Sequence, residues 1–188
     1  MPLKKESRII GIDDGPFDKF KDKEALIVGT VFRGGQYLDG ILTTRVSIDG
    51  FDATYNIIQM IKKSKWKSQI RAIMLDGIAV AGFNVINIKN LHKETGIPVI
   101  VIIRQYPDYE GMFRALKKLG MNEKIKLIET IEKPEKVNTI YIQREGISIR
   151  EALALLKITC THAKIPEPVR IAHIIASGLS TGESKGAA

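Results

Sequence analysis

The sequence predicts an α/β fold with a mixed β-sheet, in which three antiparallel strands precede alternating helices and strands, with extra helices near the C-terminus. Two patterns predict it. Residues 8–48 contain three consecutive runs of strand-forming residues. Beyond residue 52, helical and strand-like patterns alternate, as they do in β-α-β units with parallel strands. A strand meander joined to such units requires both strand orientations in one sheet.

The first three strands are expected at residues 8–13, 24–33 and 36–48. Gly34 and Gly35 separate the second run from the third. A Gly-Gly pair between strand-forming segments is typical of a β-hairpin, because glycine adopts the positive φ that tight hairpin turns need. At least two of these strands are therefore expected to be antiparallel.

Helices and strands then alternate along the chain. Ile57, Ile58, Ile61 and Lys65 recur at helical spacing, which predicts a helix within residues 52–68. The later elements are expected at residues 71–80 (strand), 84–96 (helix closed by Gly96), 97–103 (strand), 109–120 (helix closed by Gly120), 138–143 (strand), 148–163 (helix) and 166–179 (helix).

Length and composition indicate one domain over residues 1–188, with only the last few residues, 182–188, expected to be disordered. The net charge of +8 favours an acidic partner such as nucleic acid. Cys160 is the only cysteine, which excludes an intramolecular disulfide and fits a reducing compartment. No apolar run resembles a signal peptide or membrane span, so we expect a cytoplasmic protein without a membrane partner.

Acidic residues follow two of the expected strands directly. The strand at residues 8–12 ends in Asp13 and Asp14, and the strand at residues 71–75 ends in Asp76. If these strands are parallel neighbours, their ends meet at the sheet edge where open α/β sheets place their sites. Strand alternation then turns Asp14 away from Asp13, unless the strand has already ended.

Asp49 precedes the first helix in the segment SIDGFDAT and is a third candidate, whereas Asp52 is most simply a helix N-cap. Carboxylates that converge repel one another unless a divalent cation lies among them, and oxygen ligands suit Mg²⁺ or Mn²⁺. We therefore predict Asp13, Asp49 and Asp76 as catalytic metal ligands, with Asp14 auxiliary. The alternative is that these aspartates only form turns.

Three basic residues are candidates for contacts with phosphate. Arg104 follows the strand at residues 97–103, and Arg170 and His173 lie three residues apart on one face of the last helix. A helix that packs through Val169 and Ala172 also needs polar residues on its outer face, so the pair can equally be a solvated surface.

Several motifs resemble a known family. GIDDGPF, SIDGFDAT and IMLDGIAVAGFNVIN resemble segments of endonuclease V, which has the ribonuclease H-like fold, and more closely an uncharacterised archaeal family related to it. The resemblance covers residues 8–105, and IPEPVRIAHIIASG resembles the archaeal family's own signature. It implies three antiparallel strands, then helix, strand, helix and strand, with Mg²⁺ at the carboxylate edge and a nucleic-acid substrate.

Some residues depart from endonuclease V. Where that family has Asp-Gly-His-Gly after its fourth strand, this chain has the apolar DGIAVAGF. At the acidic position before the first helix, endonuclease V has a glutamate and this chain has Asp49 or Asp52. After the fifth strand, endonuclease V has a lysine and this chain has Arg104 and Gln105. Three functions stay open: a Mg²⁺-dependent nuclease acting on DNA or RNA, a non-catalytic nucleic-acid-binding protein, and a protein-interaction module whose aspartates are turns.

Overall fold

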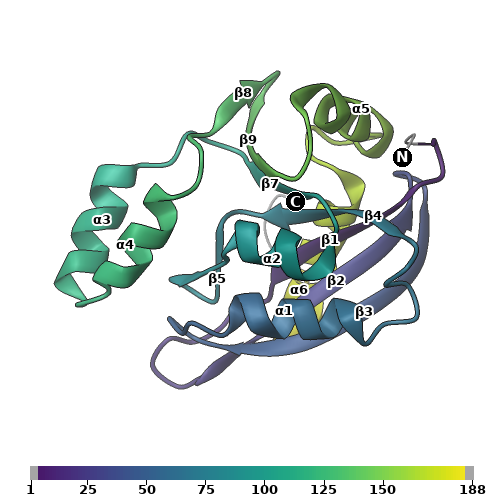
Figure 1. Ribbon diagram of the computed structural model, residues 1–188. Coiled ribbons are helices and arrows are strands. Elements are labelled where there is room, and N and C mark those ends of the chain that lie inside the picture. The colour runs from purple at the N-terminus through teal and green to yellow at the C-terminus, as the bar shows by residue number, and fades with distance from the viewer. Residues whose placement is uncertain (1–3, 185–188) are drawn as a thin grey trace.

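A computed structural model describes residues 4–184 and contains a central seven-stranded sheet (Figure 1). Its elements are β1 (Arg8–Asp14), β2 (Glu24–Arg33), β3 (Tyr37–Ser47), α1 (Ala53–Lys62), β4 (Ile70–Asp76), β5 (Ala79–Val80), β6 (Asn84–Val85), α2 (Ile88–Thr95), β7 (Val99–Ile103), α3 (Tyr109–Lys118), α4 (Asn122–Glu129), β8 (Glu135–Val137), β9 (Ile140–Glu145), α5 (Ile149–Thr159) and α6 (Glu167–Thr181).

The sheet confirms the expected mixed topology. Its strand order is β3-β2-β1-β4-β7-β9-β8, and β5 pairs only with β6 in a separate hairpin. Strands β1, β2 and β3 form an antiparallel meander, β1, β4 and β7 are parallel, and β9 returns antiparallel to β7. The carboxyl ends of β1, β4 and β7 therefore lie at one edge of the sheet.

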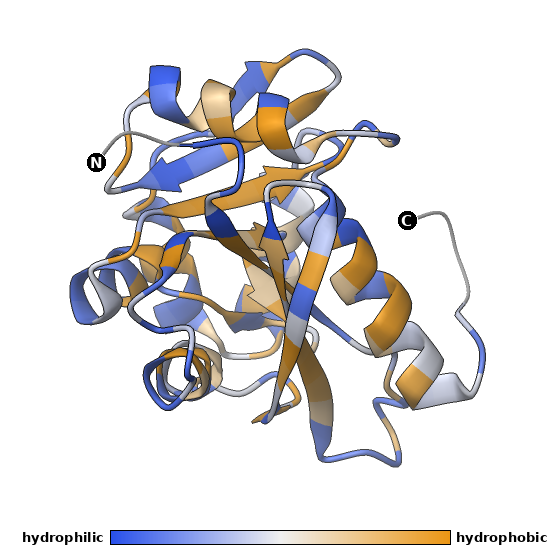
Figure 2. Cartoon of the chain, turned by 90° about the vertical axis from the view of Figure 1, so that its right-hand side faces the viewer, coloured by the Kyte–Doolittle hydropathy of each residue, from blue (hydrophilic) through white to orange (hydrophobic). Residues whose placement is uncertain are grey.

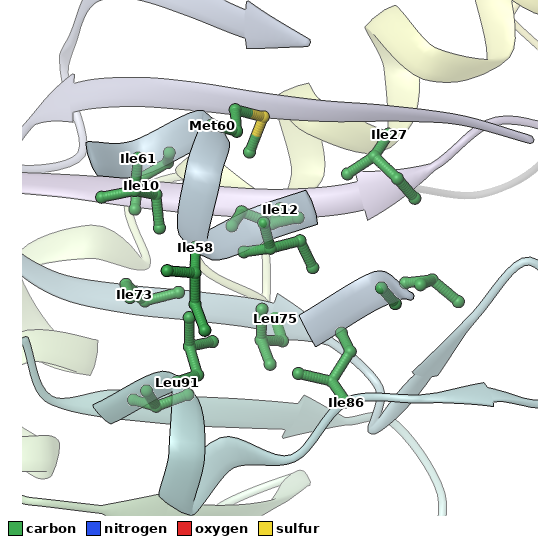
Figure 3. Packing of buried hydrophobic residues seen from close by; sticks show 14 of the residues in the cluster. Ile10, Ile12, Ile27, Ile58, Met60, Ile61, Ile73, Leu75, Ile86 and Leu91 are labelled. Carbon is green, nitrogen blue, oxygen red and sulfur yellow. The ribbon is translucent and has the colours of Figure 1, made fainter. Parts of the chain in front are cut away.

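One face of the sheet is covered by α1 and α2 (Figure 1). Figure 3 shows Ile10 and Ile12 of β1 and Ile73 and Leu75 of β4 in one apolar cluster with side chains of the two helices, Ile58 and Ile61 of α1 and Leu91 of α2. Alternate residues of a strand face opposite sides of the sheet. Gly11, which lies between the two isoleucines of β1, and Asp13, which follows Ile12, therefore belong to the other face.

That other face is covered by α5 and α6, whose apolar side chains pack on Ile9, Met74 and Ile102. Figure 2 shows hydrophobic residues concentrated along the strands and hydrophilic residues along the loops and outer helix turns. Helix α6 lies directly on β1: a Cβ atom at Gly11 would come within 2.2 Å of the carbonyl carbon of Pro168. The hydroxyl of Thr30 donates a 2.6 Å hydrogen bond to the Pro168 carbonyl oxygen.

Local structure differs from the sequence prediction around Asn84. The helix expected at residues 84–96 begins only at Ile88, because Asn84 belongs to β6 and its fully buried side chain is hydrogen-bonded. Its amide nitrogen donates to Asp52 Oδ1 at 2.7 Å, and its Oδ1 accepts from the Ala53 N–H at 3.1 Å. Asp52 occupies the N-cap position as expected, but Asn84 supplies the hydrogen bond to the first turn of α1.

Other boundaries also shift. Helix α1 ends at Lys62, so Lys65 lies beyond it, and the sequence patterns did not indicate α4, β8 or the β5–β6 hairpin. Helix α6 ends at Thr181, and its C-cap residue Gly182 has a positive φ of 80°. The disorder expected for the last residues falls mainly on 185–188, outside the described residues. Within residues 4–184, no helix is long and apolar enough to cross a membrane.

The contact between α6 and β1 predicts the effect of Gly11→Ala. The added methyl group meets the backbone of Pro168 and Val169, which cannot rotate away, so α6 must shift. We expect the free energy of unfolding to fall by about 3 kcal/mol, the upper end for overpacking. The measurement is urea-induced unfolding followed by circular dichroism.

Gly178→Ala is the matched control, because its added methyl group meets only the Ser184 nitrogen at 3.9 Å. Within α6 this substitution should raise the free energy of unfolding by about 0.5–1 kcal/mol, as alanine is the better helix former. Equal stability of Gly11→Ala and the wild type would show that α6 is not held against β1 as described.

A candidate metal centre at the carboxyl edge of the sheet

Asp13 and Asp76 meet at the ends of two parallel strands. In the register of β1 and β4, Ile12 lies opposite Leu75, so the aspartate that follows each of them projects beside the other. Their side chains are only 7% and 10% exposed. The structure therefore brings together two of the carboxylates that the sequence predicted.

His173 of α6 completes a group of three. Its Nδ1 lies 2.8 Å from Asp13 Oδ2, and ligand atoms of Asp13, Asp76 and His173 all lie within 4.8 Å of one another. The sequence prediction placed His173 at a phosphate or on a solvated face and did not join it to the carboxylates. A usable signal was the spacing of Gly11, Asp13 and Gly15, because glycines flanking an aspartate on one strand face let a helix approach it closely.

Electrostatics of the two carboxylates reflect their burial. Burial raises the pKa of Asp13 to about 6; the hydrogen bond with His173 opposes this rise, and repulsion from Asp76 adds to it. Burial also raises the pKa of Asp76, although Arg104 counteracts it through a 2.8 Å ion pair from Nη2 to Asp76 Oδ2. In turn, the hydrogen bond to Asp13 raises the pKa of His173.

These groups fit a divalent cation. Two buried carboxylates whose charges repel each other, with an imidazole beside them, offer oxygen and nitrogen ligands in a confined space. Carboxylate oxygens suit Mg²⁺ and Mn²⁺, and the imidazole favours Mn²⁺ of the two. A bound cation would compete with protons for these carboxylates, because burial raises the pKa of both.

Asp14 faces away from this group, as strand alternation predicts. Its Oδ2 accepts a 2.9 Å hydrogen bond from the main-chain N–H of Ala81, on the side of the sheet that α1 and α2 cover. Burial raises its pKa. Asp14 therefore links the segment after β4 to the end of β1 through this hydrogen bond, and its carboxylate lies on the opposite face of the sheet from that of Asp13.

Asp49 lies outside the group of three. Its carboxylate accepts from the Phe83 N–H at 2.8 Å and pairs with Lys19 at 2.8 Å. Although burial opposes them, these contacts hold the pKa of Asp49 below its usual range. The backbone adopts a positive φ of 53°, and Lys124 donates to the Asp49 carbonyl oxygen. A ligand role for Asp49 stays a prediction.

Arg104 and Arg170 are placed differently. Arg104 contacts Asp76 at the site, and its side chain is 42% exposed, so further N–H groups face solvent beside the carboxylates. Arg170 instead donates two hydrogen bonds to Glu167 Oε2, at 3.0 and 2.8 Å, one helical turn from His173. Contact of either arginine, or of His173, with nucleic acid stays a prediction.

Comparisons with known proteins identify similar sequences over nearly the whole chain. A family model described as Endonuclease dU matches residues 5–180. A protein from Methanothermobacter thermautotrophicus, described as a UPF0215 protein, is 48% identical and covers 99% of this chain and 94% of its own length. A crystal structure of a protein of unknown function from Archaeoglobus fulgidus is 40% identical, with a TM-score of 0.85, covering 92% of this chain and 97% of that one.

More distant solved structures share the fold. Human endonuclease V is 20% identical, with a TM-score of 0.61, over 90% of this chain and 82% of that one. Ciona intestinalis endonuclease V, solved with a DNA that contains inosine, is 16% identical, with a TM-score of 0.54, over 88% of this chain and 82% of that one. The expected likeness to the endonuclease V fold is confirmed.

Metal binding should depend on the converging carboxylates. We expect Asp13→Asn and Asp76→Asn each to reduce the affinity for Mn²⁺ by about tenfold or more, because each removes a charged oxygen ligand. Isothermal titration calorimetry provides the measurement. Asp39→Asn is the control, because Asp39 pairs with Arg8 and Arg33 at the opposite end of the sheet and should leave the affinity unchanged. An affinity for Mn²⁺ equal to that of the wild type in both site variants would show that Asp13 and Asp76 do not bind the cation.

The affinity for Mn²⁺ should also rise with pH. The pKa of Asp13 is about 6, so below that pH the cation must displace a proton, and above it the carboxylate is free to bind. We expect the apparent association constant to rise by at least tenfold per pH unit below pH 6, because Asp13 and the other groups with a raised pKa, Asp76 and His173, must release protons to bind the cation. Equal affinities at pH 5 and pH 7 would contradict this protonation state.

Proposed function

This chain belongs to the endonuclease dU family, and we propose that it is a divalent-metal-dependent endonuclease that hydrolyses phosphodiester bonds in DNA or RNA. The family's description makes deoxyuridine the first substrate nucleotide to test. One observation carries the proposal: Asp13, Asp76 and His173 converge at the carboxyl edge of a sheet that shares the endonuclease V fold. The single cysteine fits a cytoplasmic, reducing location.

Asp13 and Asp76 would hold Mg²⁺ or Mn²⁺, and His173 stands beside them as a third ligand or as a proton carrier. A divalent cation supplies stabilisation of negative charge on phosphate oxygens and lowers the pKa of water. His173 keeps its Nδ1 at Asp13, which leaves Nε2 to accept a proton from the attacking water or return one to the leaving oxygen.

Arg104 complements these groups with a fixed positive charge. Its Nη2 is anchored by Asp76 at 2.8 Å, so the partly exposed guanidinium is oriented before any substrate arrives. Its remaining N–H groups can donate to a phosphate oxygen. The net charge of +8 favours the approach of a polyanion and predicts binding that weakens as salt rises.

A second function, nucleic-acid binding without hydrolysis, is favoured by the position of Asp49. The carboxylate is paired with Lys19 and the Phe83 N–H, so the site offers two carboxylates where the sequence predicted three. A substrate-free protein with two acidic ligands binds a cation weakly, since Mg²⁺ sites usually share ligation with substrate phosphates. Hydrolysis separates the two functions.

Cleavage assays should distinguish the aspartates. We expect the wild type to cut single- or double-stranded DNA or RNA containing deoxyuridine or inosine in Mg²⁺ or Mn²⁺. Asp13→Ala and Asp76→Ala should each lower the rate by about 10³-fold or more, as losses at the reacting groups do. Asp14→Ala should lower it by about tenfold or less, because Asp14 holds Ala81 and faces away from the site.

Asp39→Ala, at the far end of the sheet, is the matched control and should keep wild-type activity. Melting temperatures of all four variants separate a lost site from a lost fold. Absence of cleavage in the wild type, with salt-dependent binding retained, would favour the binding-only function. Full activity in Asp13→Ala would place the chemistry elsewhere.

A further inference from the structure

An aromatic pocket of about 350 Å³ lies between α3, α4 and the loop that follows α4. Its lining includes Tyr106, Tyr109, Phe113, Ile128, Glu129 and Lys133. The volume is near the lower end of the range for small-ligand sites, about 300–1,000 Å³. It therefore suits a single ring system better than a helix or strand of another protein.

A short stretch of chain, from Arg104 to Tyr106, connects the candidate metal centre to the pocket. Strand β7 ends at Ile103, Arg104 reaches Asp76, and Tyr106 follows two residues later. Two trans peptide units span at most about 7.6 Å between Cα atoms, so the rim of the pocket lies one short step from Arg104. Figure 1 shows α3 and α4 beyond the end of β7, on the side to which the parallel strands point.

The ring of Tyr106 is preorganised for stacking with a flat ligand. Its ring meets Tyr141 edge-on, with centroids 5.4 Å apart, and Tyr109 edge-on at 6.1 Å. These contacts hold the ring in place, yet Tyr106 stays 51% exposed. A tyrosine that is fixed by neighbours but open to solvent loses little conformational entropy when a flat ligand stacks on it.

The lining of the pocket includes both hydrogen-bond donors and hydrogen-bond acceptors. Glu129 offers acceptor oxygens and Lys133 offers donors, while Phe113 and Ile128 provide apolar walls. A nucleobase combines a flat aromatic ring with an edge of donors and acceptors, which matches this lining. The base is also carried on a polyanion, which the chain's charge of +8 attracts.

We propose that this pocket binds one unpaired nucleobase of the nucleic acid and stacks it on Tyr106. The inference rests on the proposed function and names how its substrate is held. A base that is turned out of the strand into the pocket brings its own phosphate toward Arg104 and the carboxylates of Asp13 and Asp76. The pocket then selects strands that are single or locally unpaired, because a paired base costs energy to extrude.

The test compares two single strands in EDTA, where cleavage is absent. One is an oligodeoxyuridylate of about ten nucleotides, within the range of single-domain sites, and the other is a fully abasic strand of equal length and charge. We expect the wild type to bind the abasic strand on the order of tenfold more weakly, since stacking is lost. Fluorescence anisotropy measures both affinities.

Tyr106→Ala should bind the oligodeoxyuridylate on the order of tenfold more weakly than the wild type does. Its affinity for the abasic strand should equal that of the wild type, because Tyr106 contributes to binding only through the base that stacks on it. Tyr106→Phe keeps the ring and should restore wild-type binding. The salt dependence should be the same in all three proteins, as Tyr106 contacts no phosphate.

Tyr37→Ala is the matched control, an exposed tyrosine at the end of the sheet remote from the site. Equal binding of both strands by the wild type, or an undiminished preference for the base in Tyr106→Ala, would overturn the pocket assignment and leave the proposed function standing. Failure of the wild type to bind either strand at low salt would overturn both.

Discussion

The contact between the start of α6 and the middle of β1 is the constraint on which the candidate site depends. Gly11 lets the backbone of Pro168 and Val169 lie where a side chain would otherwise project, and Thr30 holds the Pro168 carbonyl oxygen at 2.6 Å. Because α6 rests on the strand at this distance, His173 reaches Asp13 about one and a half helical turns later. A larger residue at position 11 would lift the histidine away from the carboxylates.

Burial of two acidic side chains in this contact has an energetic consequence. Asp13 and Asp76 lie almost out of water, and this burial raises the pKa of each above that of an exposed carboxylate, with their mutual repulsion adding to the rise at Asp13. Arg104 offsets part of that repulsion at Asp76, and His173 part of it at Asp13. Two buried carboxylates that repel each other lower the stability of the ligand-free fold, a cost that functional sites often carry. A divalent cation bound between them would offset this repulsion, and their oxygen ligands fit such an ion.

The sequence was sufficient to predict the sheet edge but not everything around it. The buried runs that end in Asp13 and Asp76 predicted the two strand ends, because strand alternation is a local pattern. The parallel pairing of these strands followed from the β-α-β order of the elements and is seen in the sheet. The role of Asn84 was hidden, since its buried hydrogen bonds to Asp52 and Ala53 join segments about thirty residues apart. The positive φ of Asp49, which directs its carboxylate to Lys19 and Phe83, likewise arises from tertiary contacts that a local pattern does not record.

We propose that Asp13, Asp76 and His173 form one divalent-cation site. Anomalous diffraction from crystals soaked in Mn²⁺ tests it most directly, because the signal locates the ion independently of any activity. We expect a single strong peak between the two carboxylates, with ligand distances of about 2.0–2.3 Å to Asp13 and Asp76. A peak centred on Asp49, or no peak at the edge where β1 and β4 end, would contradict it.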